Sequence, residues 1–340
     1  MAVSPMNHST QPSDRVRTLA GAVAAVAPVA RELAGQLAVT PPIQKPDDTP
    51  VTVADFVLQA VLVHTLRQQL GAAHFINEES ATSLLTSGRP DVVKVFCSHV
   101  RRLTGVASDD AAVALLDAPP AGAREWWLMD PIDGTAGFIQ GGHFSVCVAQ
   151  VKDGQVQLAA VGSPRLAADG PATVQVAGPG SVVAAERAHG AWQWAEAPGG
   201  ALGQARALQR PAWSAPLRWA RSMNRRKLPA RAQPAIEQLG VPLESIHIDS
   251  QCKYALVADG RADLVVRLPV ARGPERGWDH LAGALLATEA GACVTDLAGA
   301  PLNAGTGSLL SANTGILVAP PEIHAQLVEA IRPIASEAGV

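Results

Sequence analysis

The sequence predicts a fold of mixed helix and strand, α+β or α/β, organised as two domains. Its 340 residues are about twice the ~150 of a typical domain. Apolar residues at helical spacing also alternate along the chain with short strand-like runs. Hydrophobic residues make up 48% of the chain and charged residues only 17%, below the ~25% of typical soluble domains. We therefore expect a compact, enzyme-sized protein whose core is packed mainly by Ala, Val and Leu.

The first expected element is a helix over residues 14–37. It follows a polar, aperiodic segment, residues 1–13, that predicts a disordered tail. Apolar residues recur every three or four positions on one helix face, with Asp14 as the expected N-cap and a kink near Pro28. A secretory signal peptide is the alternative, because basic residues precede the apolar run. That run is too short to span a membrane, so we favour the helix.

A loop over residues 40–50 separates this helix from a second one that begins near Asp55. Two strand-like runs follow, 72–77 and 126–129, and each ends in acidic residues. Strand ends favour functional groups because a rigid sheet positions the side chain while the loop leaves it accessible. The long stretch between the two runs is predicted to be helical in part.

The alternating runs on both sides of Asp153–Gly154 predict a β-hairpin, because an Asp-Gly pair suits a type I′ turn. A segment rich in Gly and Ala follows and places a domain junction within 165–185. We therefore expect an N-terminal α+β domain over 14–170 and a C-terminal α/β domain over 171–335.

Charge and cysteine content exclude several classes of protein. The 27 basic and 30 acidic residues give a net charge of −3, which leaves no broad cationic surface for a nucleic-acid backbone. A membrane partner is not expected either. The cysteines lack any CxxC spacing, which excludes a zinc ribbon and indicates buried thiols in a reducing, cytoplasmic compartment. They are Cys97, Cys147, Cys252 and Cys293.

The most informative segment runs from Asp130 to Thr135 and reads DPIDGT. Its carboxylates, Asp130 and Asp133, are three residues apart and can converge on one point, while Gly134 lets the backbone come close. Such oxygen-rich ligands suit Mg²⁺. Thr135 offers a hydroxyl and backbone N–H groups at a turn, a seat for phosphate. The alternative is that DPxDG forms only a turn.

Other acidic residues strengthen the metal hypothesis. Asp279 stands where a helix begins, so it is either an N-cap, a metal ligand or both. Glu78 follows a strand, and its alternative is a solvated surface position. Asp55 has the alternative of capping its own helix. We expect His280 on a helix surface and Tyr254 in the packing rather than stacked on a base.

Four segments, VTVAD, EES, WWLMDPIDGT and WDHLAGALLATEAGACVTDLAG, resemble the lithium-sensitive Mg²⁺-dependent phosphatases that include inositol monophosphatase. The resemblance covers nearly the whole chain. Within that superfamily, IDSQCKYALVADGRADLVVRLP resembles the signature of the 3′(2′),5′-bisphosphate nucleotidases. The KPDDTPVTVAD segment and the long stretch between Glu79 and Asp130 point the same way. The resemblance implies the layered αβαβα sandwich of the inositol monophosphatase and fructose-1,6-bisphosphatase type, and a role in sulfur metabolism.

The resemblance implies a phosphomonoesterase that converts adenosine 3′,5′-bisphosphate to AMP and phosphate by metal-activated water attack. Asp55 and Thr135 would draw off the proton of the attacking water, and a metal would neutralise the departing 3′-oxygen. A sulfated precursor of the nucleotide is a further substrate to expect. Two or three Mg²⁺ ions would be held by the Ile132 carbonyl and by the carboxylates of Glu78, Asp130, Asp133 and Asp279.

The substrate residues also follow from the resemblance. Lys253 and Arg267 suit a doubly phosphorylated ligand because they counter its second phosphate. Their alternative is that both are ordinary surface cations. The expected substrate contacts are Gly134, Thr135, Ser250, Lys253, Arg267 and Asp279.

The sequence departs from the family pattern in places. Asn77 replaces a usual glycine, Ala136 replaces a common lysine or arginine, and Ala292 replaces the second glycine of EAGG. The cationic segment 221–227 stands where nucleotidases carry a histidine-containing stretch. The substrate is therefore less firmly predicted than the reaction type.

Three rival hypotheses follow. An inositol- or sugar-phosphate phosphatase would use the same metal chemistry. A catalytically silent nucleotide sensor would keep the fold, but the intact carboxylate set argues against it, since close acidic groups repel unless a metal offsets them. Nucleic-acid binding through 221–227 is the third. The chain is expected to be a monomer or a homodimer.

Overall fold

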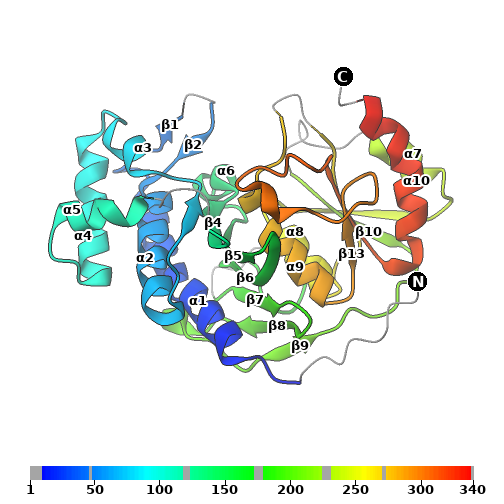
Figure 1. Cartoon of the computed structure of the whole chain (residues 1–340), viewed down its shortest axis with the longest axis horizontal. Helices are drawn as coiled ribbons and strands as arrows, with labels where there is room; N and C mark the ends of the chain where they lie inside the picture. The colour runs from blue at the N-terminus through cyan, green and yellow to red at the C-terminus, as the bar shows by residue number, and fades with distance from the viewer. Residues whose placement is uncertain are drawn as a thin grey trace.

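Helix and sheet layers alternate across the molecule in the order α, β, α, β, α (Figure 1). This order confirms the predicted layered sandwich. The protein is represented by a computed structural model that describes residues 10–45, 48–117, 123–171, 179–223, 231–269 and 273–337.

The larger sheet has seven strands in sequence order, and only its first pair, β3 and β4, is parallel. The predicted hairpin is confirmed: β5 and β6 meet at Asp153 and Gly154, whose φ angles of 49° and 75° both lie in the left-handed region. The predicted 126–129 strand is longer than expected. The strands are β3 (Phe75–Asn77), β4 (Glu125–Asp133), β5 (Ser145–Lys152), β6 (Gln155–Ser163), β7 (Ser181–Glu186), β8 (Gly190–Ala195) and β9 (Arg206–Leu208).

Two helices, α1 (Asp14–Ala34) and α2 (Val53–Leu70), pack on one face of this sheet. The predicted N-cap is wrong by one residue, because the Ser13 hydroxyl accepts from the backbone N–H of Val16 at 3.2 Å. The predicted 40–50 loop contains two short paired strands, β1 (Ile43–Gln44) and β2 (Pro50–Val51). Outside α2 lie α3 (Ala81–Leu85), α4 (Pro90–Thr104), α5 (Asp109–Val113) and η1 (Ala114–Leu116).

The opposite face of the large sheet is covered by α8 (Cys252–Ala258) and α9 (Leu281–Glu289). The next layer holds the parallel pair β10 (Leu217–Arg221) and β11 (Leu243–His247) and the antiparallel strands β12 (Val265–Arg267), β14 (Ile316–Ala319) and β13 (Cys293–Thr295). The outer layer is α7 (Ala232–Glu237) and α10 (Pro321–Glu337). Short elements complete the chain: α6 (Thr135–Ile139), η2 (Pro198–Gly200), η4 (Gly277–Asp279) and η5 (Ala304–Thr306).

The predicted division at residues 170 and 171 falls between β6 and β7, which pair within one sheet. The division into two domains therefore stays a prediction. Three apolar clusters fill the spaces between the layers, and the middle one joins the large sheet to α8 and α9.

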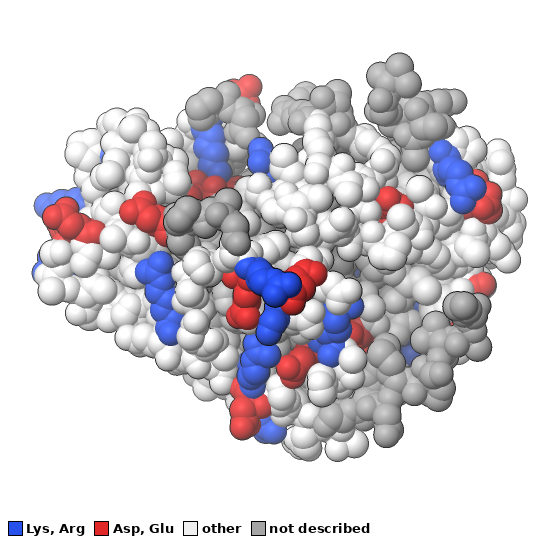
Figure 2. All heavy atoms as spheres, in the orientation of Figure 1, with Lys and Arg blue, Asp and Glu red and all other residues white. Residues whose placement is uncertain are grey.

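The surface and the helices bear on possible partners. Within the described residues, no helix is both long and apolar enough to cross a bilayer. On the face drawn in Figure 2, basic and acidic side chains are intermixed, and the described residues form no broad basic patch there. This distribution agrees with the small net charge.

Candidate active site at the end of strand β4

The DPIDGT segment begins in a strand, passes through a tight turn and ends in the first residue of a short helix. β4 ends at Asp133, and its pairing with β5 is irregular between Asp130 and Asp133. Gly134 then takes a φ of 90°, and α6 begins at Thr135. A Cβ atom on Gly134 would lie 3.2 Å from the Ser250 Cβ, so this position needs both a left-handed backbone and a missing side chain.

Three carboxylates converge at this turn: the two that the motif spacing predicted, Asp130 and Asp133, and Asp279, which the resemblance implied. Asp130, Asp133 and Asp279 each offer an oxygen, and the three oxygens lie within 4.8 Å of one another. The Ile132 N–H donates to Asp130 Oδ1 at 3.0 Å, which orients that side chain. Ser145 Oγ donates to Asp133 Oδ2 at 3.3 Å. The Gln251 backbone N–H also donates to Asp133 Oδ2.

The N-cap role considered for Asp279 is wrong. Asp279 ends η4, and α9 begins after His280 without a side-chain cap. Its carboxylate is therefore not committed to the helix terminus.

The electrostatics of the cluster favour a bound cation. Burial raises the pKa of Asp130 well above its usual range, and the charges of Glu78, Asp133 and Asp279 raise it further. Burial and Asp133 raise the pKa of Asp279 to about 8. Burial also raises the pKa of Asp133, although Lys253 opposes the shift. Buried carboxylates that repel each other in this way can be ionised together when a divalent cation lies between them.

Glu78 lies beside this cluster and is paired with a lysine. Its backbone N–H donates to the Met129 carbonyl at 3.3 Å, which fixes it next to β4. Lys45 Nζ lies 3.2 Å from Glu78 Oε1 and also contacts Glu79 Oε1. Burial alone would lower the pKa of Lys45, but the two glutamates outweigh it and raise the pKa. Lys45 and the Glu79 side chain were not predicted as site residues from the sequence, although both belong to segments that carry the resemblance.

Asp55 joins α2 to the turn. Its Oδ2 accepts from the Thr52 backbone N–H at 2.8 Å and from Thr52 Oγ1 at 2.7 Å, so Asp55 closes a capping box instead of being the N-cap. Its Oδ1 lies 3.4 Å from Thr135 Oγ1, which is 3.1 Å from the Ile132 carbonyl. Burial and the charge of Glu79 raise the pKa of Asp55 to about 8.

Three of the expected substrate residues, Ser250, Lys253 and Arg267, belong to segments that follow the large sheet in the sequence. Ser250 precedes α8 with a φ of 65°, and its Oγ accepts from the Cys252 N–H at 3.2 Å. Burial lowers the pKa of Lys253, whereas the nearby charge of Asp133 raises it. Arg267 ends β12, where Nε donates to Glu275 Oε1 at 2.8 Å.

Two further expectations can be compared with the structure. His280 is not on a helix surface, because only 9% of it is exposed. In the cationic segment 221–227, Arg221 is anchored to Gln233 and Ser245, and the Asp249 carboxylate accepts from Ser222 Oγ. Residues 224–227 lie outside the described residues.

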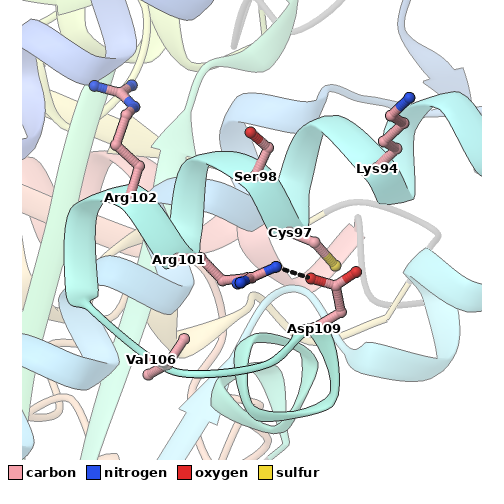
Figure 3. Close-up of a pocket in the computed structure, with 7 residues that line it drawn as sticks. All are labelled: Lys94, Cys97, Ser98, Arg101, Arg102, Val106 and Asp109. Atoms are coloured by element: carbon pink, nitrogen blue, oxygen red, sulfur yellow. Dashed lines mark hydrogen bonds and ion pairs between the residues drawn. The ribbon is translucent and has the colours of Figure 1, made fainter.

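A separate hollow of ≈ 520 Å³ lies between α4 and α5 (Figure 3). Arg101 turns toward Asp109, 3.2 Å away, whereas Lys94 and Arg102 point elsewhere. These cations do not converge, and the carboxylate cluster is on another part of the molecule. The hollow is therefore not the candidate site.

Comparisons with known sequences agree with this geometry. The profile of the Inositol monophosphatase family matches residues 13–336. A 3′(2′),5′-bisphosphate nucleotidase of Emericella nidulans is 31% identical over 86% of this chain and 90% of its own length. The 3′(2′),5′-bisphosphate nucleotidase 1 of Arabidopsis thaliana is 32% identical over 85% of this chain and 87% of its own length.

Solved structures share the fold. An IMPase of Thermotoga maritima has a TM-score of 0.63 at 19% identity and covers 96% of this chain and 100% of its own. CysQ of Bacteroides thetaiotaomicron, a bacterial member of the inositol monophosphatase family, has a TM-score of 0.58 at 18% identity. The match covers 90% of this chain and 97% of CysQ.

Proposed function

Because the chain belongs to the inositol monophosphatase family, we propose that it is a 3′(2′),5′-bisphosphate nucleotidase. It removes the 3′-phosphate of adenosine 3′,5′-bisphosphate and releases AMP and phosphate. The observation that carries this proposal is the convergence of three carboxylates, those of Asp130, Asp133 and Asp279. The positive charge of Lys253 acts on Asp133, and that of Arg267 acts on Asp279. The names of the relatives favour this substrate over the alternative of an inositol or sugar phosphate.

The donor set fits magnesium. Mg²⁺ prefers carboxylate and carbonyl oxygens, and this site supplies both without any sulfur or imidazole ligand. When bound, two or three Mg²⁺ ions would polarise the phosphoryl group and lower the pKa of water. Ser145 and the Gln251 N–H keep Asp133 oriented for this role. The proposed ligands are Glu78, Asp130, the Ile132 carbonyl, Asp133 and Asp279.

Asp55 and Thr135 form the proton-accepting pair. Because Thr52 occupies Oδ2 of Asp55, Oδ1 is left to accept the Thr135 hydroxyl. A water that donates its proton toward Thr135 Oγ1 would find the next acceptor in Asp55. Burial and the charge of Glu79 raise the pKa of Asp55, which strengthens its affinity for a proton.

The substrate side of the site supplies positive charge. Lys253 and Arg267 counter the second phosphate, and the missing side chain of Gly134 lets the turn lie close to the Ser250 side chain. We extend the proposal to inhibition by Li⁺, to a sulfated nucleotide as second substrate and to a role in sulfur metabolism. A cytoplasmic location fits the four cysteines, which are free thiols.

Product analysis tests the proposal. The protein is incubated with adenosine 3′,5′-bisphosphate and Mg²⁺, and the products are identified by ³¹P NMR, with EDTA as the metal-free control. We expect adenosine 5′-phosphate and inorganic phosphate with Mg²⁺ and no turnover with EDTA. Release of the 5′-phosphate, or binding without turnover as in a nucleotide sensor, would contradict the proposal.

A further inference from the structure

A chain of buried polar contacts runs behind Arg267. Arg267 Nε donates to Glu275 Oε1 at 2.8 Å, and the other oxygen, Glu275 Oε2, lies 3.3 Å from His280 Nε2. On the far side of that ring, the Tyr254 hydroxyl is 2.9 Å from His280 Nδ1. Tyr254 is 1% exposed, Glu275 8% and His280 9%. The side chains of Glu275, His280 and Tyr254 each have a polar partner in this network, which makes the arrangement well defined.

The contact uses only part of the guanidinium group. Arg267 meets Glu275 through Nε, and among the described residues neither of its terminal nitrogens has a hydrogen-bond partner. Its side chain is 30% exposed, whereas that of Glu275 is 8% exposed. An arginine held through Nε keeps the N–H groups of its two terminal nitrogens free to donate together to one ligand. That is the geometry that binds a phosphate in a bidentate manner.

The same contacts link three elements that border the site. Arg267 ends β12, Tyr254 lies in α8 next to Lys253, and His280 follows Asp279 at the end of η4. The rigid helices and strand therefore fix the carboxylate of Glu275 from two sides. A change at Glu275 would release Arg267 without removing its charge.

Charge also favours this arrangement. Burial would raise the pKa of Glu275, but His280 and Arg267 outweigh it and lower the pKa to about 2. Burial would lower the pKa of Arg267, and Glu275 reverses this shift. The pair therefore stays ionised near neutral pH.

We infer that Glu275, supported by His280 and Tyr254, is a positioning residue that aims Arg267 at the second phosphate of the substrate. This inference rests on the proposed function, because only a substrate with two phosphates needs the second cationic contact. It assigns Glu275 a role in specificity that acts through Arg267 and not through the carboxylate cluster.

A double-mutant cycle tests the inference. KM and kcat are measured for wild type, Glu275→Ala, Arg267→Ala and the double variant, with adenosine 3′,5′-bisphosphate and with p-nitrophenyl phosphate, which has one phosphate. We expect Glu275→Ala to raise KM for the bisphosphate about tenfold, the effect of one lost aligned contact, with a much smaller change in kcat. In the Arg267→Ala background the same change should have no further effect.

Conservative variants keep the test independent of folding. Glu275→Gln retains the Oε1 acceptor and should recover most of the KM, and Tyr254→Phe should raise KM in the same direction by a smaller factor. The matched control is Glu329→Ala, which removes an exposed glutamate paired with Arg332 at 2.9 Å. Unfolding temperatures of all variants identify any that fail to fold.

Two outcomes would overturn the inference, and they can be told apart. Equal losses from Glu275→Ala in the wild-type and Arg267→Ala backgrounds, with the wild type still preferring the bisphosphate, overturn the positioning role alone. A wild type that shows no preference for the bisphosphate overturns the proposed function, and the positioning role fails with it.

Discussion

At the scale of single residues, the site depends on how each carboxylate is held. Asp133 accepts from Ser145 and from the Gln251 N–H while it faces Asp130 and Asp279. We predict that Asp133→Asn lowers kcat by about 10³-fold, because the shape is kept and the charge that a metal needs is lost. Steady-state kinetics with Mg²⁺ check this, and circular dichroism checks the fold.

The control for that variant is Asp153→Asn in the exposed hairpin turn, where Asn tolerates the left-handed backbone. It should retain wild-type kinetics. A full kcat for Asp133→Asn would show that the metal assignment is wrong.

The Thr135 hydroxyl is the second residue-scale test. Thr135→Val removes the group between Asp55 and the Ile132 carbonyl, and we predict a fall in kcat of about 10²-fold. Thr135→Ser keeps the hydroxyl and should recover most of the rate. If Val and Ser behave alike in stopped-flow and steady-state assays, the hydroxyl has no part in proton transfer.

At this scale, only side-chain contacts between residues close in the sequence could be predicted. The approach of Asp130 to Asp133 could be predicted from one motif, because three residues of chain link them. The Lys45 contact with Glu79 could not be predicted from spacing, since the two residues are 34 positions apart and belong to different elements.

At the scale of secondary-structure elements, the β4–α6 turn is the most constrained. Gly134→Ala meets both an unfavourable φ and a Cβ contact of 3.2 Å with Ser250. Gly71→Ala is the matched control, because Gly71 also has a positive φ but has no atom within 4 Å. We predict a loss of about 1 kcal/mol in unfolding free energy for Gly71→Ala, and a larger loss together with reduced kcat for Gly134→Ala. Denaturant titration measures both, and equal losses would contradict the close approach.

The positions of the helices and strands could be predicted from the periodicity of apolar residues, but the residues at which they begin and end could not. The hairpin at Asp153 was predicted correctly because its turn chemistry is specific. The predicted cap at Asp14 was wrong by one residue, and the cap that was an alternative for Asp55 and for Asp279 is not formed, since neighbouring residues take the N-cap position. For Asp55 and Asp279 the actual geometry leaves carboxylate oxygens directed toward the site.

At the scale of the whole molecule, the buried carboxylates couple stability to pH. The pKa values of Asp55 and Asp279 rise from 3.8 to about 8 in the folded protein. The favourable contribution of the protonated Asp55 and Asp279 carboxyl groups to folding stability is fully present below pH ~4. It is lost as the pH rises through about 8. We predict that the metal-free protein unfolds at a lower temperature at pH 8.5 than at pH 6.

Magnesium should offset that loss, because it binds the deprotonated carboxylates. The increase in Tm caused by Mg²⁺, relative to EDTA, should therefore be larger at pH 8.5 than at pH 6. Asp279→Asn should weaken this difference. A Tm in EDTA that does not fall between these pH values would contradict the buried, coupled cluster.

The layered architecture could be predicted at this scale because the resemblance spans nearly the whole chain and the family profile matches residues 13–336. Substrate choice could not be predicted as firmly. It depends on Lys253 and Arg267, which match the nucleotidase pattern, and on the 221–227 segment, which departs from it.

The most direct test of the proposed nucleotidase activity compares two substrates under one condition. Release of inorganic phosphate is measured with Mg²⁺ at pH 7.5 from adenosine 3′,5′-bisphosphate and from inositol 1-phosphate, and kcat/KM is obtained for each. We predict a kcat/KM at least about tenfold higher for the bisphosphate, since Lys253 and Arg267 meet a second phosphate only there. A clear preference for inositol 1-phosphate would contradict it.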